Sequence, residues 1–97
     1  MKVLHLTLKK KWFDMIESGE KVEEYREVKP YWVTRLEGRE YDVVRFRNGY
    51  SKDARVMVVE LLGIGRGLGV LRWGAPELEC LFVLRLGKVL EVGGSSE

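Results

Sequence analysis

The sequence predicts an α+β domain: a small mixed β-barrel of five or six strands, with helices capping its openings. The predicted order of elements is strand, helix, strand, short helix, and then three or so strands joined by at least one hairpin. Two segments with helical spacing lie between the first predicted strands. An Asn48-Gly49 pair between two apolar segments is a strong hairpin signal. A small sheet of mostly antiparallel strands tends to curl and close, because closure removes its exposed edges.

Residues 2–8 form the first predicted strand, with the leucines on one face and His5 and Thr7 on the other. Residues 9–18 are predicted to form a helix, because their apolar side chains recur at helical spacing. Gly19 is a natural end for this helix, since glycine adopts the left-handed conformation without steric cost.

Residues 21–28 form a predicted strand with an unusual pattern. Val22, Glu24, Arg26 and Val28 fall on one face of it, because side chains alternate along a strand. The valines mark this face as buried, yet an acid–base pair lies between them. Charges on a buried face are costly unless they are paired, and they are usually retained for a reason.

The hairpin follows a second, shorter helix. Pro30 begins this helix and Gly38 ends it. Residues 41–47 form the next strand, and residues 54–62 form its hairpin partner. The partner is apolar on both faces, so we expect it to lie at the centre of the sheet.

The last third of the chain begins with GIGRGLG at residues 63–69, which has glycine at every second position. Its glycine spacing is not that of a phosphate-binding loop. We expect a flexible loop here, with Arg66 able to contact a phosphate. Residues 80–86 and 88–92 supply the last one or two strands.

The chain of 97 residues favours a single domain over residues 1–92, with residues 93–97 as a disordered tail. The formal net charge of +2 is too small to indicate nucleic-acid binding alone. A single cysteine, Cys80, favours a reducing, cytoplasmic location, and we expect it in the core. We expect neither a signal peptide nor a membrane-spanning segment. Many charged residues and one asparagine favour a thermophilic source.

Lys21, Glu24 and Arg26 are the first candidate site. They either form ion pairs on a solvated strand or point together into a cleft at the mouth of the barrel. Glu60 lies among apolar residues in VMVVELL. Its carboxylate either pairs with Arg26 or Lys21, or reaches solvent at the end of a strand.

Aromatic and basic residues near the predicted loops suit base stacking combined with phosphate contacts. The alternative for at least one tryptophan, Trp32, is that it fills the barrel. The aromatic candidates are Tyr25, Tyr31, Trp32, Tyr50 and Trp73, and the basic ones are Arg45, Arg47 and Arg66.

The lone histidine, His5, shares a strand face with Thr7, and an isolated histidine is more often structural than catalytic. One histidine and one cysteine are also too few for the usual ligand set of zinc. We therefore predict no metal site and no cofactor.

The segment 19-GEKVEEYR-26 matches the G-x-K-x-x-E-x-R signature of the ASCH domain, a small PUA-like barrel. The resemblance extends over essentially the whole chain. It includes VLHLTLKKKWFDMIESGEK near the start, KPYW at 29–32, FRNGYS at 46–51, and the later WGAP and LGKVLEV.

The resemblance implies a charged cleft between the barrel and the first helix, and an association with RNA or modified nucleosides. It implies ligand contacts by Lys21, Glu24 and Arg26. Among the aromatic residues, Tyr25 and Tyr50 are the predicted ligand contacts. Some ASCH proteins resemble amidohydrolases of N4-acetylcytidine, and others are described as ribonucleases. For the amidohydrolase type, Lys21 matches the catalytic lysine and Glu60 the acid.

The threonine nucleophile of that type is replaced here by Glu24, which is a departure from the hydroxyl mechanism. The sequence thus favours an RNA- or nucleotide-binding domain. Two alternatives stay open: a hydrolase in which Glu24 or Glu60 is the general base, and a small structural or interaction protein.

Overall fold

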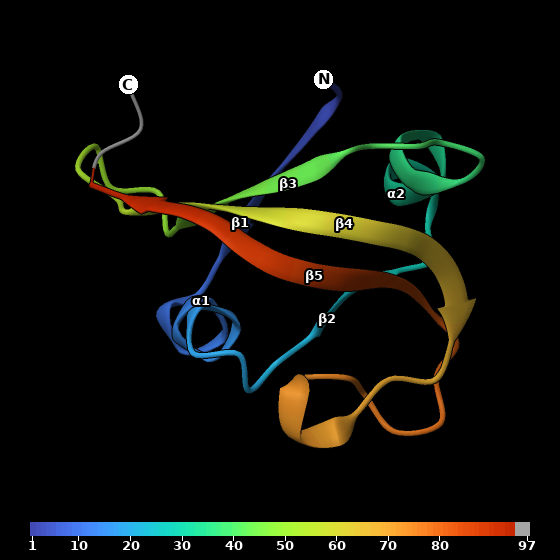
Figure 1. Ribbon diagram of the computed structural model, residues 1–97. Helices are drawn as coiled ribbons and strands as arrows, with labels where there is room; N and C mark the ends of the chain where they lie inside the picture. The colour runs from blue at the N-terminus through green and yellow to red at the C-terminus, as the bar shows by residue number, and fades with distance from the viewer. Residues whose placement is uncertain (95–97) are drawn as a thin grey trace.

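The computed structural model describes residues 1–94, which form a five-stranded mixed sheet curled into a half-barrel with two helices (Figure 1). This confirms the predicted fold class. In chain order the elements are β1 (Val3–Leu8), α1 (Lys10–Glu17), β2 (Glu23–Glu27), α2 (Pro30–Leu36), β3 (Val43–Asn48), β4 (Val56–Gly67), the short 3-10 helix η1 (Leu71–Trp73) and β5 (Leu81–Gly93).

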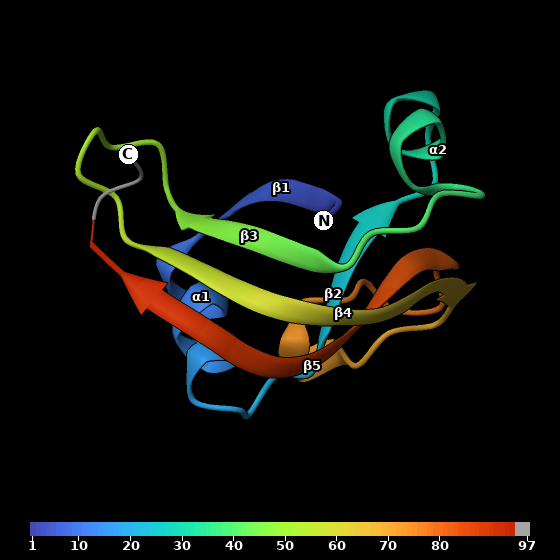
Figure 2. The ribbon, with the colours of Figure 1, turned by 45° about the horizontal axis from the view of Figure 1, so that its top comes forward.

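The strands are ordered β1-β3-β4-β5-β2 across the sheet (Figure 2). Only the β1–β3 pair is parallel, and β4 lies at the centre, as its apolar sequence predicts. Because β1 and β2 are the two outermost strands, curling of the sheet brings their free edges toward each other. We call the gap between these two edges the seam.

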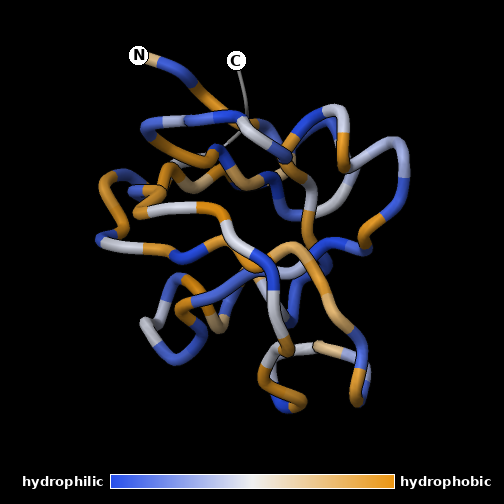
Figure 3. Tube along the Cα trace, turned by 90° about the vertical axis from the view of Figure 1, so that its right-hand side faces the viewer, coloured by the Kyte–Doolittle hydropathy of each residue, from blue (hydrophilic) through white to orange (hydrophobic). Residues whose placement is uncertain are grey.

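The core lies inside the curl of the sheet. Buried leucines alternate with more exposed residues along β1, so this strand turns one face inward. Hydrophobic and hydrophilic residues are interspersed along the chain (Figure 3). Helix α1 adds Phe13 and Ile16 to the core. The main buried cluster consists of Leu4, Leu6, Leu8, Phe13, Ile16, Leu36, Val44, Phe46, Met57, Val59, Leu61, Phe82, Leu84 and Leu86.

Both helices end where the sequence predicts. Gly19 and Gly38 have φ values of 86° and 68°, in the left-handed region that favours glycine. Neither helix within residues 1–94 is long and apolar enough to cross a membrane.

The predicted loop at residues 63–69 is wrong, because β4 continues as a strand to Gly67. Of the one or two strands expected at the C-terminal end, the structure has one, β5, which runs through Gly87. The pairing of β4 with β5 shifts register between Val58 and Gly63. A Cβ atom at Gly87 would clash with the side chain of Glu60, so glycine leaves room here for a side chain of the neighbouring strand.

The predicted burial of the valines beside β2 is also wrong, whereas that of the acid between them is confirmed. Val22 and Val28 lie outside the strand and are 45% and 37% exposed, whereas Glu24 is 4% exposed and Lys21 only 2%. The ionic residues therefore face the interior. Cys80 is exposed rather than in the core.

Part of the predicted C-terminal tail belongs to the sheet, because β5 ends at Gly93. Residues 95–97 of that tail lie outside the described residues.

Candidate functional site

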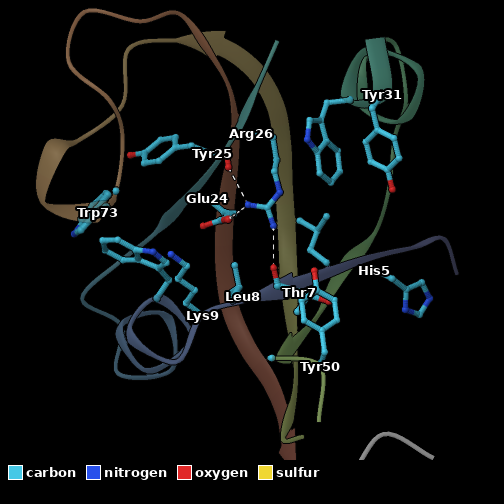
Figure 4. A pocket seen from close by; sticks show the side chains of 15 residues that line it. His5, Thr7, Leu8, Lys9, Glu24, Tyr25, Arg26, Tyr31, Tyr50 and Trp73 are labelled. Atoms are coloured by element: carbon cyan, nitrogen blue, oxygen red, sulfur yellow. Dashed lines mark hydrogen bonds and ion pairs between the residues drawn. The ribbon is translucent and has the colours of Figure 1, made fainter. Parts of the chain in front are cut away.

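A pocket of about 760 Å³ lies at the seam, between the free edges of β1 and β2 (Figure 4). Helices α1 and α2 flank it, together with the turn after β3 and the η1 segment. Its lining residues are His5, Leu6, Thr7, Leu8, Lys9, Trp12, Glu24, Tyr25, Arg26, Tyr31, Trp32, Gly49, Tyr50, Trp73 and Gly74.

Lys21, Glu24 and Arg26 form a buried ionic cluster in the wall of this pocket. The Nζ atom of Lys21 lies 3.2 Å from Glu24 Oε1, and the Nη1 atom of Arg26 donates to Glu24 Oε2. Lys21 Nζ also donates to the main-chain oxygen of Trp73 at 2.5 Å. The Glu24 carboxylate is therefore held on both sides by cations.

The turn after α1 explains why Lys21 points inward. Gly19 reverses the chain, and the N–H of Lys21 then donates to the main-chain oxygen of Met15 at 3.0 Å. This bond folds the chain back across the end of the helix. Strand β2 begins two residues later, and its alternation places Glu24 and Arg26 on one face.

Lys21 lies between two aromatic rings. Its Nζ atom is 5.1 Å from the ring centre of Trp12 and 4.8 Å from that of Tyr25, within the range of cation–π attraction. Burial lowers the pKa of Lys21 below its ordinary value of 10.5, and the Glu24 carboxylate opposes this shift. Lys21 lies behind the pocket wall and is not among the residues that line it.

Arg26 joins the two sides of the seam. Its Nη1 atom donates to the main-chain oxygen of Tyr25 at 3.0 Å, and its Nη2 atom donates to that of Thr7 at 3.2 Å (Figure 4). The guanidinium group also lies over the ring of Trp32, 5.2 Å from its centre. One side chain thus connects β2, β1 and α2.

Tyr25 connects β2 to the segment before η1. Its hydroxyl donates to Glu23 Oε1 at 2.7 Å and accepts from the N–H of Val70 at 2.9 Å. Burial raises the pKa of Tyr25 to about 12. This pair of bonds positions the segment that carries Trp73.

Five aromatic side chains other than Tyr25 line the pocket: Trp12, Tyr31, Trp32, Tyr50 and Trp73. The rings of Tyr31 and Trp32 pack edge to face at 4.8 Å. Tyr50 is 86% exposed at the rim, so its ring is available to a ligand.

The predicted site residues fall into two groups. Glu24, Tyr25, Arg26 and Tyr50 line the pocket, and Lys21 supports it from behind. Arg45, Arg47, Arg66 and Glu60 do not line it.

The three outlying arginines have other surroundings. Arg47 donates to the main-chain oxygens of Tyr50 and Ser51, so it holds the turn that carries Tyr50. Arg66 lies in β4, where it pairs with Glu37. Arg45 lies on β3, opposite His5 in the register.

Glu60 does not form the ion pair that the sequence suggested. Its Oε1 atom accepts from the N–H of Lys88 at 3.2 Å, and within residues 1–94 it has no cationic side chain within 4.0 Å. It occupies the irregular stretch of the β4–β5 pair, away from Lys21 and Arg26.

Four lining residues were missed as ligand contacts: His5, Thr7, Lys9 and Trp12. His5 is exposed at the pocket, contrary to its predicted structural role. Alternation along β1 shows which face His5 and Thr7 occupy, but the position of the seam depends on which strands are outermost. No sequence pattern fixes that order.

Comparison of the chain with protein-family models, with curated proteins and with solved structures finds no significant match. The geometry of the pocket therefore carries the functional argument.

Replacing Glu24 with glutamine should destabilise the fold by about 3 kcal/mol, because Lys21 would lose its counter-ion while still buried. Chemical denaturation measures this change in the free energy of unfolding. Glu27→Gln is the matched control, since Glu27 is an exposed neighbour on the same strand. Equal effects of the two substitutions would contradict a buried, interdependent cluster.

Tyr25 should make the stability of the protein depend on alkaline pH. Between pH 10 and 12 an unfolded chain releases the proton of this phenol, whose ordinary pKa is 10.0, while the folded protein retains it. The free energy of unfolding should therefore fall as the pH rises through this window. Denaturation series of the wild type and Tyr25→Phe measure the effect, which should be smaller in the variant. A parallel dependence in both proteins would refute it.

Proposed function

We propose that this protein binds single-stranded RNA or a nucleotide, with one base inserted in the seam pocket. The observation that carries this proposal is the lining itself: six tyrosine and tryptophan rings surround a cleft whose wall contains the guanidinium group of Arg26. Aromatic rings stack on bases, and cationic groups contact phosphates. The pocket volume of about 760 Å³ is within the usual range for small-molecule sites.

The charge of the pocket also suits an anionic ligand. Lys9 and Arg26 line it, and Glu24 is its one lining carboxylate within residues 1–94. That carboxylate is already paired with Lys21 and Arg26, so little negative charge faces the pocket. Lys9 is exposed at the start of α1, where it is free to meet a phosphate.

We further propose that the chain is an ASCH-type domain. The signature residues Gly19, Lys21, Glu24 and Arg26 support this assignment, because each has a defined part in forming the pocket wall. An association with RNA or modified nucleosides is what that resemblance implies.

The hydrolase hypothesis has weaker support. Glu60 lies away from the pocket, so Glu24 is the remaining candidate base. Both of its carboxylate oxygens are occupied by cations. A general base must reach the proton that it removes, and this carboxylate would first have to leave one partner. The arrangement favours binding over turnover.

Titration with a six-nucleotide single-stranded RNA, followed by tryptophan fluorescence, tests the proposal. Tyr50→Ala should weaken binding about tenfold, because one stacking ring is worth about 1–3 kcal/mol. Lys9→Ala should also weaken binding. The slope of log affinity against log salt concentration should become shallower by the amount expected for the loss of about one phosphate contact. Arg45→Ala, a basic residue outside the pocket, is the matched control and should bind like the wild type.

Mass spectrometry of the same mixtures should show intact RNA. Binding that is independent of salt, or equally weakened by Arg45→Ala and Tyr50→Ala, would argue against the pocket as the RNA site. Product that is formed by the wild type but not by Glu24→Gln, under conditions where that variant is folded, would instead support the hydrolase.

A further inference from the structure

Strand β1 has one strand neighbour, β3, so its other edge is free along the seam. Main-chain groups alternate sides along a strand. The oxygen of Leu8 accepts from Gly49, next to β3, whereas the oxygen of Thr7 accepts from Arg26, across the seam. Thr7 and His5, two residues apart, therefore direct their main-chain N–H and C=O groups toward the seam.

Three of these four main-chain groups have no strand partner within residues 1–94: the N–H and C=O of His5 and the N–H of Thr7. Both residues line the pocket. Unpaired edge groups act as a template for whatever can pair with them. The seam thus presents a main-chain acceptor with donors on both sides of it.

The rings around the pocket favour a flat ligand at this edge. A base that stacks on aromatic rings leaves its hydrogen-bonding edge exposed. Each base carries an N–H donor beside an acceptor on its Watson–Crick edge. Such a donor–acceptor pair is complementary to the C=O of His5 and the N–H of Thr7.

An extended peptide is a weaker fit for the same edge. A strand added to β1 would pair with the C=O of Thr7 as well, but this oxygen already accepts from Arg26. The guanidinium group therefore interrupts the edge after a short stretch. A single planar ring fits the stretch that is left.

We propose that the free edge of β1 recognises the base through the main chain, with the C=O of His5 accepting from a base N–H and the N–H of Thr7 donating to the adjacent acceptor. This inference rests on the proposed function. It predicts that several bases bind, since each offers such a pair, and that a base without the N–H binds poorly.

Uridine 5′-monophosphate and its 3-methyl derivative test this directly, because the methyl group replaces the N3–H and leaves ring and phosphate in place. Fluorescence titration should show at least tenfold weaker binding of the methylated nucleotide. Adenosine and N6,N6-dimethyladenosine monophosphates should differ in the same direction. Equal affinities within both pairs would overturn main-chain recognition.

Thr7→Pro removes the proposed donor, and proline is tolerated on a free strand edge. It should weaken binding of uridine monophosphate about tenfold. Val3→Pro is the matched control, since Val3 lies on the same edge but outside the pocket lining. Thermal melting establishes that each variant folds. If Thr7→Pro does not fold, the affinities of the wild type for the methylated and unmethylated nucleotides test the inference on their own.

The outcomes separate the two proposals. Nucleotide binding without sensitivity to methylation or to Thr7→Pro would leave the proposed function standing and overturn the main-chain inference. Absence of binding by every nucleotide and RNA would overturn both, and capture of an extended peptide at β1 in its place would identify a peptide site.

Discussion

Glu24 is buried at the seam of the half-barrel, where a lone carboxylate would be strongly disfavoured. Lys21 and Arg26 offset that cost from opposite sides. Each cation also contacts main-chain oxygen elsewhere: Lys21 reaches Trp73, and Arg26 reaches Thr7. The cluster therefore fixes more than its own strand. It ties together the η1 segment, β2 and the free edge of β1, and these are the elements that form the pocket.

A buried ion cluster is not an efficient way to stabilise a small domain, because apolar residues of similar volume often stabilise as much or more. In this fold the cluster matters more for the geometry of the seam than for stability. Arg26 spans the seam with a directional bond, and the aromatic rings of Trp12 and Trp32 lie against the cations. The seam is held at a defined width without being closed by a sixth strand. A pocket with aromatic walls and one free strand edge is the result.

Much of this arrangement could be predicted from local sequence. Periodicity located most of the strands and the first helix, and Pro30 and Gly38 marked the second. The charged residues of β2 and most of the pocket's aromatic residues stood out by their number and spacing, whereas Lys9 and Trp12 did not. The failures arose where neighbours in space decide the outcome. Gly63 and Gly87 resemble loop glycines, but they lie within β4 and β5 and leave room for the side chains of Arg85 and Glu60 on the paired strand. Likewise, Val22 suggested a buried face, but the turn after α1 carries Lys21 inward in its place.

Amide NMR spectra of the labelled protein, recorded during titration with uridine 5′-monophosphate, would show whether the cluster-supported seam binds a nucleotide. Binding there should give the largest shifts at the amides of His5 and Thr7 and at the indole N–H groups of pocket tryptophans, with little change at Glu60 and Arg66. Shifts centred on Glu60 and Arg66, or no shifts at saturating nucleotide, would contradict it.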